Sequence, residues 1–217
     1  MAWADGSGSS AWVVMAEDAP GPGTPAEPRG PETPAVSREP EVPAEPPEPV
    51  MMVFRRVGDE CVARITPQDA QILRQSMASL AALLADDPDP DDPAVGRLFP
   101  AVYPDDPVQQ AEFRRLTETE LRTTKLNQAR GVLADLVEAG REVRLTPERA
   151  ELWLRALTDV RLALGTRLGV TDDTDIEAEI DAAVGRDPES PRVMQLTVYL
   201  YLTYLQESLV GALTDAG

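Results

Sequence analysis

The sequence has 217 residues, a formal net charge of −18, one cysteine and no histidine. These counts exclude a disulfide within the sequence, a His/Cys zinc site, a Ser-His-Asp triad and a Cys-His pair. No pair among the 38 acidic residues lies in a recognisable two-carboxylate motif. The composition therefore indicates neither an enzyme nor a resident metal or cofactor.

Charge also bears on nucleic acids. Residues 1–50 hold nine acids and two arginines, a net −7, so that −11 of the total −18 belongs to the remaining residues. A phosphate backbone repels such a domain unless the cations of the domain gather on one face. We therefore expect no direct binding of nucleic acid.

Residues 1–50 are expected to form a disordered tail rich in proline, alanine and glutamate. They hold 11 of the 21 prolines and no Leu, Ile, Phe or Tyr, so they cannot bury enough apolar surface to offset the entropy of ordering. Residues 51–217 have a usual length for one domain with one core. We predict a single α-helical domain there.

No segment has the pattern of a signal peptide or a membrane span. The apolar run of the tail, AWVVMA at residues 11–16, is too short for a signal-peptide core. No other run reaches the ~18 apolar residues of a transmembrane helix. We expect a cytoplasmic protein, and the position of Met51 and Met52 leaves open that the tail is an over-long start-site assignment.

Residues 52–65, MVFRRVGDECVARI, are typical of a β-hairpin at the edge of the domain. Two runs rich in Val, Phe and Ile flank the dipeptide Gly58-Asp59. The alternation of side chains along a strand places Cys61 on the inner, apolar face. A thiol in such surroundings has a raised pKa and reacts slowly.

The hairpin is followed by a helix start. Thr66 and Pro67 have the residue types of an N-cap and a first helical position, ahead of a periodic apolar pattern of about five turns. Prolines and acids at residues 86–93, DDPDPDDP, end the pattern. That run lacks the ligand spacing of a calcium loop, so we interpret it as a solvated linker.

Residues 107–139 have a helical pattern with an internal capping box. Thr117 and Glu120 stand three residues apart in the order that caps a helix start. We therefore predict two helices, a short one over 107–115 and a longer one that runs to about residue 139.

Arg122 and Lys125 fall on the apolar stripe of the longer helix, where a charge needs a partner. One interpretation is that both reach the rim of the core or pair with acids such as Asp105, Asp106 or Glu207. The other is a small anion or partner site formed by Arg114, Arg115, Arg122, Lys125 and Arg130.

The C-terminal half continues with a short strand and three helices. Residues 142–145 predict a third strand packed on the hairpin, and residues 147–168 predict a mostly buried helix. Within that helix Arg155 and Asp159 lie one turn apart, so we predict that they form a structural pair.

An acidic amphipathic helix is predicted over residues 171–185. The last helix, which begins at Pro191, is apolar on all sides and is therefore either the centre of a bundle or a dimer seam. The expected fold class is mainly α: a helical bundle with a small N-terminal β-hairpin, preceded by the tail.

Three segments stand out in order along the chain: VYPDDP with EFRRLTETELRTTK, LTPERAELWLRALTDVRLALGTRLGV and YLTYLQESLVGAL. Together they resemble an actinobacterial family that was long described as a domain of unknown function and is named for the oxidative-stress transcriptional regulator AosR. The resemblance covers about residues 52–213. It implies a redox-linked transcriptional regulator that acts through a protein partner, such as a sigma factor of RNA polymerase.

Thiol sensing in such a regulator would use a Cys-x-x-x-Cys pair, whereas Val57 and Ile65 stand four residues from Cys61 here. Cys61 is the redox candidate, and its oxidation product would be a sulfenate, a mixed disulfide or a Cys61–Cys61 dimer. Two other functions stay open: an adaptor or scaffold without a redox role, and a DNA-binding regulator. The adverse charge and the lack of an exposed recognition helix disfavour the latter.

Overall fold

The computed structural model describes residues 51–85, 89, 91–138 and 141–214. The predicted tail, 1–50, and part of the predicted linker at 86–93 lie outside the described residues. The described part is mainly α-helical with one small antiparallel sheet, which confirms the predicted fold class. Its elements, in chain order, are β1 (Arg55–Val57), β2 (Glu60–Arg64), α1 (Pro67–Leu83), α2 (Pro93–Leu98), α3 (Pro107–Glu138), β3 (Glu142–Leu145), α4 (Pro147–Leu168), α5 (Ile176–Arg186) and α6 (Pro191–Thr214).

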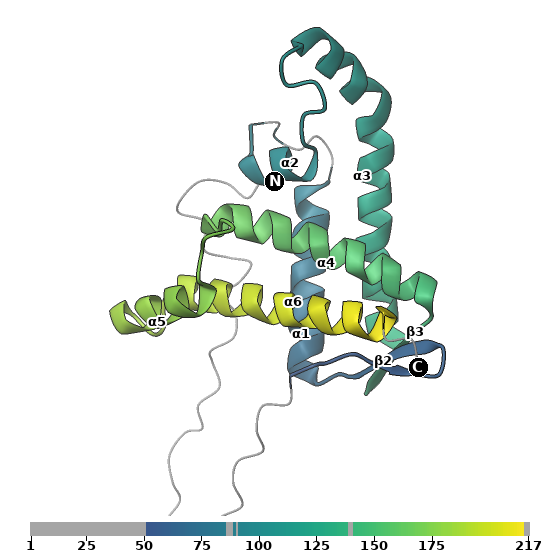
Figure 1. The fold of residues 1–217 in the computed structure, drawn as a ribbon, viewed down its shortest axis with the longest axis vertical. Helices are drawn as coiled ribbons and strands as arrows, with labels where there is room; N and C mark the ends of the chain where they lie inside the picture. Colours follow the sequence, from purple (N-terminus) through teal and green to yellow (C-terminus); the bar gives the residue numbers. More distant parts are fainter. Residues whose placement is uncertain (1–50, 86–88, 90, 139–140, 215–217) are drawn as a thin grey trace, which may run out of the picture.

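Two pairs of antiparallel helices cross each other (Figure 1). α1 and α3 pack side by side as the upright pair, and α4 and α6 pack against each other as the second pair, which lies across the first. The upper end of α3 extends beyond the other helices, and α5 lies beside the start of α6. The short helix α2, which the sequence pattern did not predict, packs on α4.

The three strands lie where α3 ends and α4 begins. Their order is β1-β2-β3, with both pairs antiparallel, so the third strand predicted at residues 142–145 is confirmed. Gly58 adopts a φ of 63° in the hairpin turn, a conformation that glycine reaches without steric cost. The backbone N–H of Phe54, just before β1, donates to the Ser208 hydroxyl on α6 and fastens the hairpin to the bundle.

Threonines start two of the long helices as predicted. The Thr66 hydroxyl accepts from the backbone of Asp69, whose carboxylate in turn accepts from the Thr66 backbone in a reciprocal capping box. At the start of α4 the Thr146 hydroxyl accepts from the backbone N–H of Arg149, without a reciprocal bond. Gly169 ends α4 with a φ of 71°.

The predicted break in α3 is wrong, because α3 is one helix of 32 residues. Thr117 does not cap a helix start: its hydroxyl donates to the carbonyl oxygen of Phe113, one turn earlier within the same helix. A threonine can satisfy its hydroxyl inside a helix in this way. The residue types of a capping box are therefore present without its geometry.

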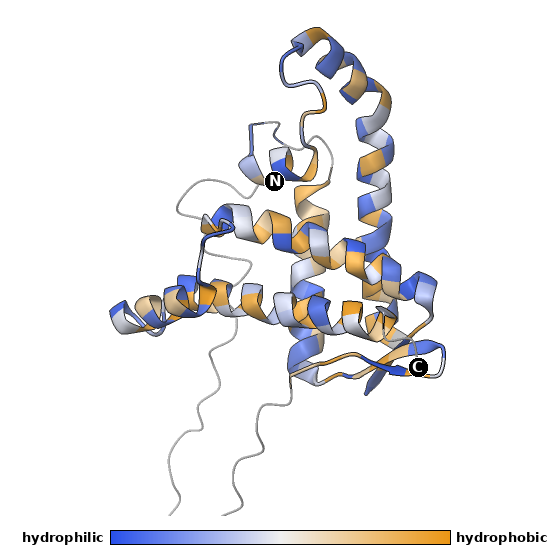
Figure 2. Ribbon diagram, viewed as in Figure 1, coloured by the Kyte–Doolittle hydropathy of each residue, from blue (hydrophilic) through white to orange (hydrophobic). Residues whose placement is uncertain are grey.

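The core lies between the two helix pairs and extends to the sheet, and apolar residues line all four long helices (Figure 2). Trp153 of α4 is fully buried and meets Phe54 edge to face, with ring centroids 5.7 Å apart. α6 buries Leu196, Leu202, Leu205 and other residues in this core, which fits the interpretation of α6 as a central bundle helix. Within the described ranges, every helix is too short or too polar to span a bilayer.

A polar clamp joins α4 to α6 at the surface of the core. Arg161 donates to the Gln206 side chain at 2.6 Å and to the Thr203 hydroxyl at 3.1 Å. Its guanidinium group also lies 5.5 Å from the ring centroid of Tyr199. These contacts fix the pairing of the two helices, because Arg161 is tied to α6 by three separate side chains.

Candidate functional site

Cys61, the redox candidate, lies in β2 with its side chain in the core. Its exposed fraction is 2%, so the predicted inward position is confirmed. The residue is opposite Arg56 of β1 on one side and Leu145 of β3 on the other. Burial raises the pKa of the Cys61 thiol above its ordinary value, and the positive charge of Arg56 acts in the opposite direction.

The surroundings of Cys61 limit what its thiol can do. The nucleophile in thiol oxidation is the thiolate, which a raised pKa disfavours. The nearest cation, Arg56, is itself held by the carbonyl oxygens of Gly58 and Leu213 at 3.0 and 3.4 Å. An oxidant would have to reach the sulfur through an opening of the sheet, so the geometry favours an inert thiol in the closed fold. The redox role of Cys61 stays a prediction.

The five cations proposed for an anion or partner site do not converge on one pocket. All lie on α3, and Arg114 and Arg130 are about 24 Å apart at the rise of an α-helix. Arg115 is exposed and pairs with Glu112 at 2.7 Å, while Arg114 lies 3.9 Å from Glu118. Arg130 is exposed and Arg122 is half-buried.

Lys125 has a different environment from these arginines. Its ammonium group donates to the Asp159 carboxylate of α4 at 2.6 Å, and the side chains are 20% and 6% exposed. None of the suggested partners of Lys125, which were Asp105, Asp106 and Glu207, is the observed one. Burial raises the pKa of Asp159, and the hydrogen bond and the charge of Lys125 act against that rise.

The predicted Arg155–Asp159 pair is wrong. Asp159 faces the core, because α4 turns this position toward Lys125 of α3. Arg155 faces solvent and pairs with Glu151 at 3.1 Å, one turn in the other direction. Helical spacing allows Arg155 to pair with either Glu151 or Asp159. Because Asp159 is buried, exposed Arg155 pairs with Glu151.

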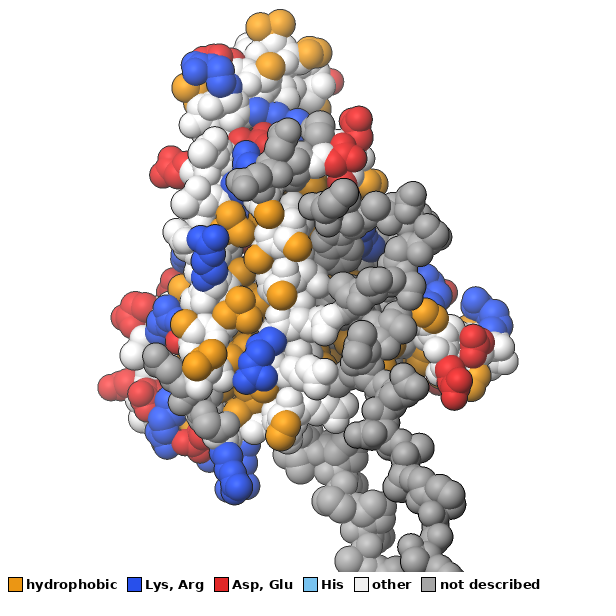
Figure 3. Space-filling view, turned by 180° about the vertical axis from the view of Figure 1, so that it is seen from behind, with side chains coloured by type: hydrophobic (Ala, Val, Ile, Leu, Met, Phe, Trp, Pro, Cys, Tyr) orange, Lys and Arg blue, Asp and Glu red, His pale blue; other side chains and the backbone are white. Residues whose placement is uncertain are grey.

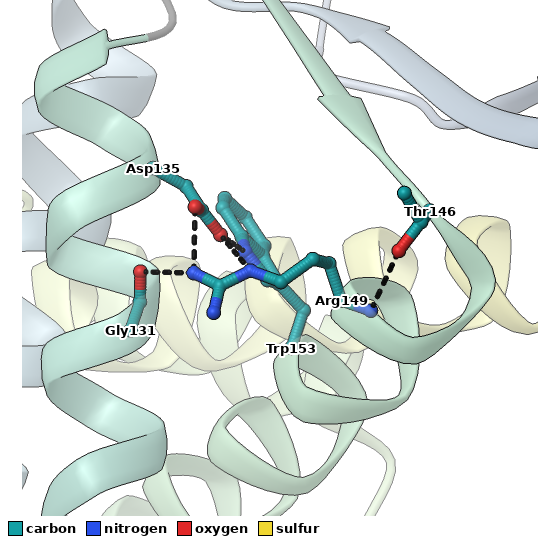
Figure 4. Close-up of polar contacts among 5 residues, drawn as sticks. All are labelled: Gly131, Asp135, Thr146, Arg149 and Trp153. Carbon is teal, nitrogen blue, oxygen red and sulfur yellow. Dashed lines mark hydrogen bonds and ion pairs between the residues drawn. The ribbon is translucent and has the colours of Figure 1, made fainter.

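A second polar contact between α3 and α4 was missed by the sequence analysis (Figure 4). Arg149 donates two hydrogen bonds to the Asp135 carboxylate, at 2.6 and 3.2 Å, and a third to the carbonyl oxygen of Gly131 at 2.9 Å. The indole N–H of Trp153 donates to the same carboxylate at 2.8 Å. A buried tryptophan needs an acceptor for its N–H. The presence of Trp153 in a mostly apolar helix was therefore the sequence signal for an acid opposite α4.

Together these contacts fix the packing of α3 on α4. In the described ranges, no group of three or more His, Cys, Asp or Glu side chains is arranged to hold a metal ion. The inward charges of α3, Lys125 and Asp135, pair with side chains of α4, whereas exposed Arg115 pairs with Glu112 within α3.

Comparisons with known proteins agree with the resemblance noted in the sequence. The family model described as "Domain of unknown function (DUF2017)" matches residues 51–213. Proteins named "Oxidative stress regulator AosR" from Mycobacterium tuberculosis and Mycobacterium bovis are 32% identical over 139 residues, which cover 56% of this chain and 58% of theirs. A Mycobacterium leprae protein described as a candidate AosR is 37% identical over 139 residues, 57% of this chain and 59% of its own.

The match thus spans less than two thirds of the length of these curated relatives. No solved structure matches the chain at a significant level.

Proposed function

Because this chain belongs to the DUF2017 family, we propose that it regulates the response to oxidative stress through contacts with another protein, in the cytoplasm and not as an enzyme. The observation that carries the proposal is the similarity to mycobacterial relatives that are named oxidative stress regulators, at 32% identity. The partner we propose is a sigma factor or another part of RNA polymerase. Direct contact with DNA is disfavoured by the net charge of −18.

The inward charges of the bundle support recognition over catalysis. Lys125 and Asp159 neutralise each other across two helices, and Asp135 is saturated by Arg149 and Trp153. Side chains held in this way are not available as a general acid or base for a substrate. A regulator that works by docking needs only a stable body and an accessible surface, which the two crossed helix pairs provide.

A second function is favoured by one feature, the burial of Cys61. The single thiol of the 217-residue sequence is 2% exposed, so the closed fold offers no accessible thiol sensor. An adaptor or scaffold without redox function requires no such sensor. The two functions differ in the partner and in whether the contact responds to oxidants.

Affinity purification of the full chain from oxidised and reduced cells distinguishes the regulator from the adaptor. Recovery of a sigma factor or RNA polymerase subunit, in amounts that change with peroxide, supports the regulator. Recovery of a different complex, equally from both conditions, supports the adaptor and contradicts our proposal. The Cys61→Ser variant serves as the matched control: an oxidant response that survives in this variant arises outside the thiol.

A further inference from the structure

The surface formed by α1 and α3, on the far side from α4 and α6, differs from the rest of the chain. Figure 3 shows apolar side chains gathered along the middle of this surface, with Lys and Arg side chains beside them and most Asp and Glu side chains toward its edges. We call it the α1–α3 face. Six of its residues carry the argument: Arg74, Ala78, Arg122, Arg130, Leu133 and Val137.

The α1–α3 face is positive in a chain with a net charge of −18. α1 has one acidic residue, Asp69, which is buried and whose carboxylate accepts from the backbone of the N-cap Thr66. Between residues 122 and 137 of α3 the one acidic residue is Asp135, whose carboxylate is bonded to side chains of α4. The solvent-facing charges that remain on these two segments are those of Arg74, Arg122 and Arg130.

Arg74, Arg122 and Arg130 are not neutralised by the part of the domain that the structure describes. Among the residues that the structure describes, no carboxylate forms an ion pair with any of the three guanidinium groups. Arg122 is half-buried, and its Nε is buried without a hydrogen-bond partner. A buried donor without an acceptor has a cost in free energy, so the Arg122 side chain gains from a rearrangement that turns its guanidinium group outward to a carboxylate.

Aliphatic side chains lie beside these cations. Val137 is 78% exposed, and Leu133, one turn earlier on α3, is half-buried against the core. Ala78 is exposed on the neighbouring helix α1, where a small side chain leaves room for another backbone to approach. Exposed aliphatic groups framed by like charges are typical of a surface that receives an amphipathic helix.

We propose that the α1–α3 face docks an acidic amphipathic helix of a partner protein. The apolar stripe of that helix covers Leu133 and Val137, and its Asp and Glu side chains pair with the three arginines. A nucleic acid fits this face less well than an acidic helix. Its phosphates would gain nothing from the aliphatic side chains, and the net negative charge of the chain repels them. The inference rests on the proposed function only in assuming that a protein partner exists.

The test is site-specific photo-crosslinking of the full chain in cells. A photoreactive phenylalanine analogue replaces Ala78 or Arg130 on the α1–α3 face, or Val184 on α5 as a control that is also exposed. Mass spectrometry then maps the captured segment. We expect both positions on the face, and not the control, to capture a protein segment with apolar residues at helical spacing and an excess of Asp and Glu.

Charge reversal provides the matched comparison. Arg74→Glu combined with Arg130→Glu should lower the yield of the cross-linked product at Ala78 by about tenfold or more, since like charges then face each other. Arg186→Glu, on exposed α5, should leave the yield unchanged. Retention of the wild-type circular dichroism spectrum and unfolding midpoint shows that the variants are folded.

Several outcomes would overturn the proposal: cross-links to nucleic acid, to a second copy of this chain or to a segment without excess acids, equal capture at Val184, or insensitivity to charge reversal. If a sigma factor co-purifies while the face captures nothing, the docking surface is wrong and the proposed function stands. If the face captures an acidic helix of a protein unrelated to transcription, the docking surface stands and the proposed function fails.

Discussion

Lys125 of α3 and Asp159 of α4 form an ion pair with 2.6 Å between Nζ and Oδ1, although 34 residues separate them in the sequence. Both side chains are largely buried, so each charge depends on the other for compensation. The pair fixes the position of α3 relative to α4 near the middle of both helices. The ion pair therefore holds the middle of α3 against α4, and the upper end of α3 extends from this fixed part of the helix.

Removal of the ammonium group should leave a buried carboxylate without compensation. We expect Lys125→Met to lower the free energy of unfolding at neutral pH by about 3 kcal/mol, the lower end of the range for loss of one partner from a buried pair. Urea unfolding followed by circular dichroism measures the change. Asp159→Leu in the same chain should restore part of the stability, because both buried charges are then absent; no restoration would contradict the assignment.

The same variant should respond to pH in a defined direction. Burial raises the pKa of Asp159, and Lys125→Met removes the hydrogen bond and the charge that oppose this rise. When the pKa of Asp159 is higher in the folded than in the unfolded state, the folded state binds the proton more tightly. The contribution of this group to the free energy of unfolding is then greatest below the unfolded-state pKa, and it falls as pH rises through the folded-state pKa. The stability difference between variant and wild type should therefore shrink as pH is lowered from about 7 to about 5. A difference that does not change with pH over this range would contradict the prediction.

A second test concerns the network around Asp135. Asp135→Ala leaves the indole N–H of fully buried Trp153 without its acceptor and removes the partner of Arg149. We expect a loss of about 2 to 4 kcal/mol in the free energy of unfolding. Glu112→Ala, which breaks the exposed pair with Arg115, is the matched control and should leave the urea midpoint unchanged. Similar midpoints for the two variants would show that the network does not stabilise the fold.

Local signals in the sequence were sufficient for most of the elements. Thr66 with Pro67, Gly58 and the alternation around Cys61 each act within a few residues, and the structure contains the helix start, the turn and the buried thiol that they predicted. The third strand followed from the segment EVRL at residues 142–145, in which charged and apolar side chains alternate. These features need no knowledge of what packs against them.

The ion-pair and hydrogen-bond partners of individual side chains could not be predicted in the same way. The spacing of Arg155 fits an acid on either side, and only the packing of α4 on α3 shows that Asp159 faces inward to Lys125. The Thr117 capping box failed because the helix continued through it and offered the hydroxyl a carbonyl of the previous turn. For the candidate site, the sequence supplied the cations, but tertiary contacts determine which of them remain available.

Gly165 marks a close approach of α4 to α6. A Cβ at this position would lie 3.0 Å from Cε2 of Tyr199, closer than side chains pack without a shift. Gly165→Ala should therefore destabilise the domain by about 1 to 3 kcal/mol despite the better helix propensity of alanine. Gly211→Ala on α6, where a Cβ meets nothing within 4 Å, should instead stabilise it by about 0.5 to 1 kcal/mol. Thermal unfolding of both variants decides, and a stabilised Gly165→Ala variant would contradict the close packing.

The last prediction concerns the rate at which Cys61 is oxidised. Its 2% exposure and raised pKa leave little thiolate in contact with solvent in the closed fold. Trapping of sulfenic acid with a dimedone probe after mild peroxide treatment should be at least about tenfold slower for native protein than for protein unfolded in urea. The Cys61→Ser variant shows the background of the probe, and a non-reducing gel reports any Cys61–Cys61 dimer. Rapid labelling of the native protein, or a dimer that forms without denaturant, would mean that the sheet opens readily around β2. That result would support a thiol sensor, whereas slow labelling directs the search for the oxidative signal toward the partner.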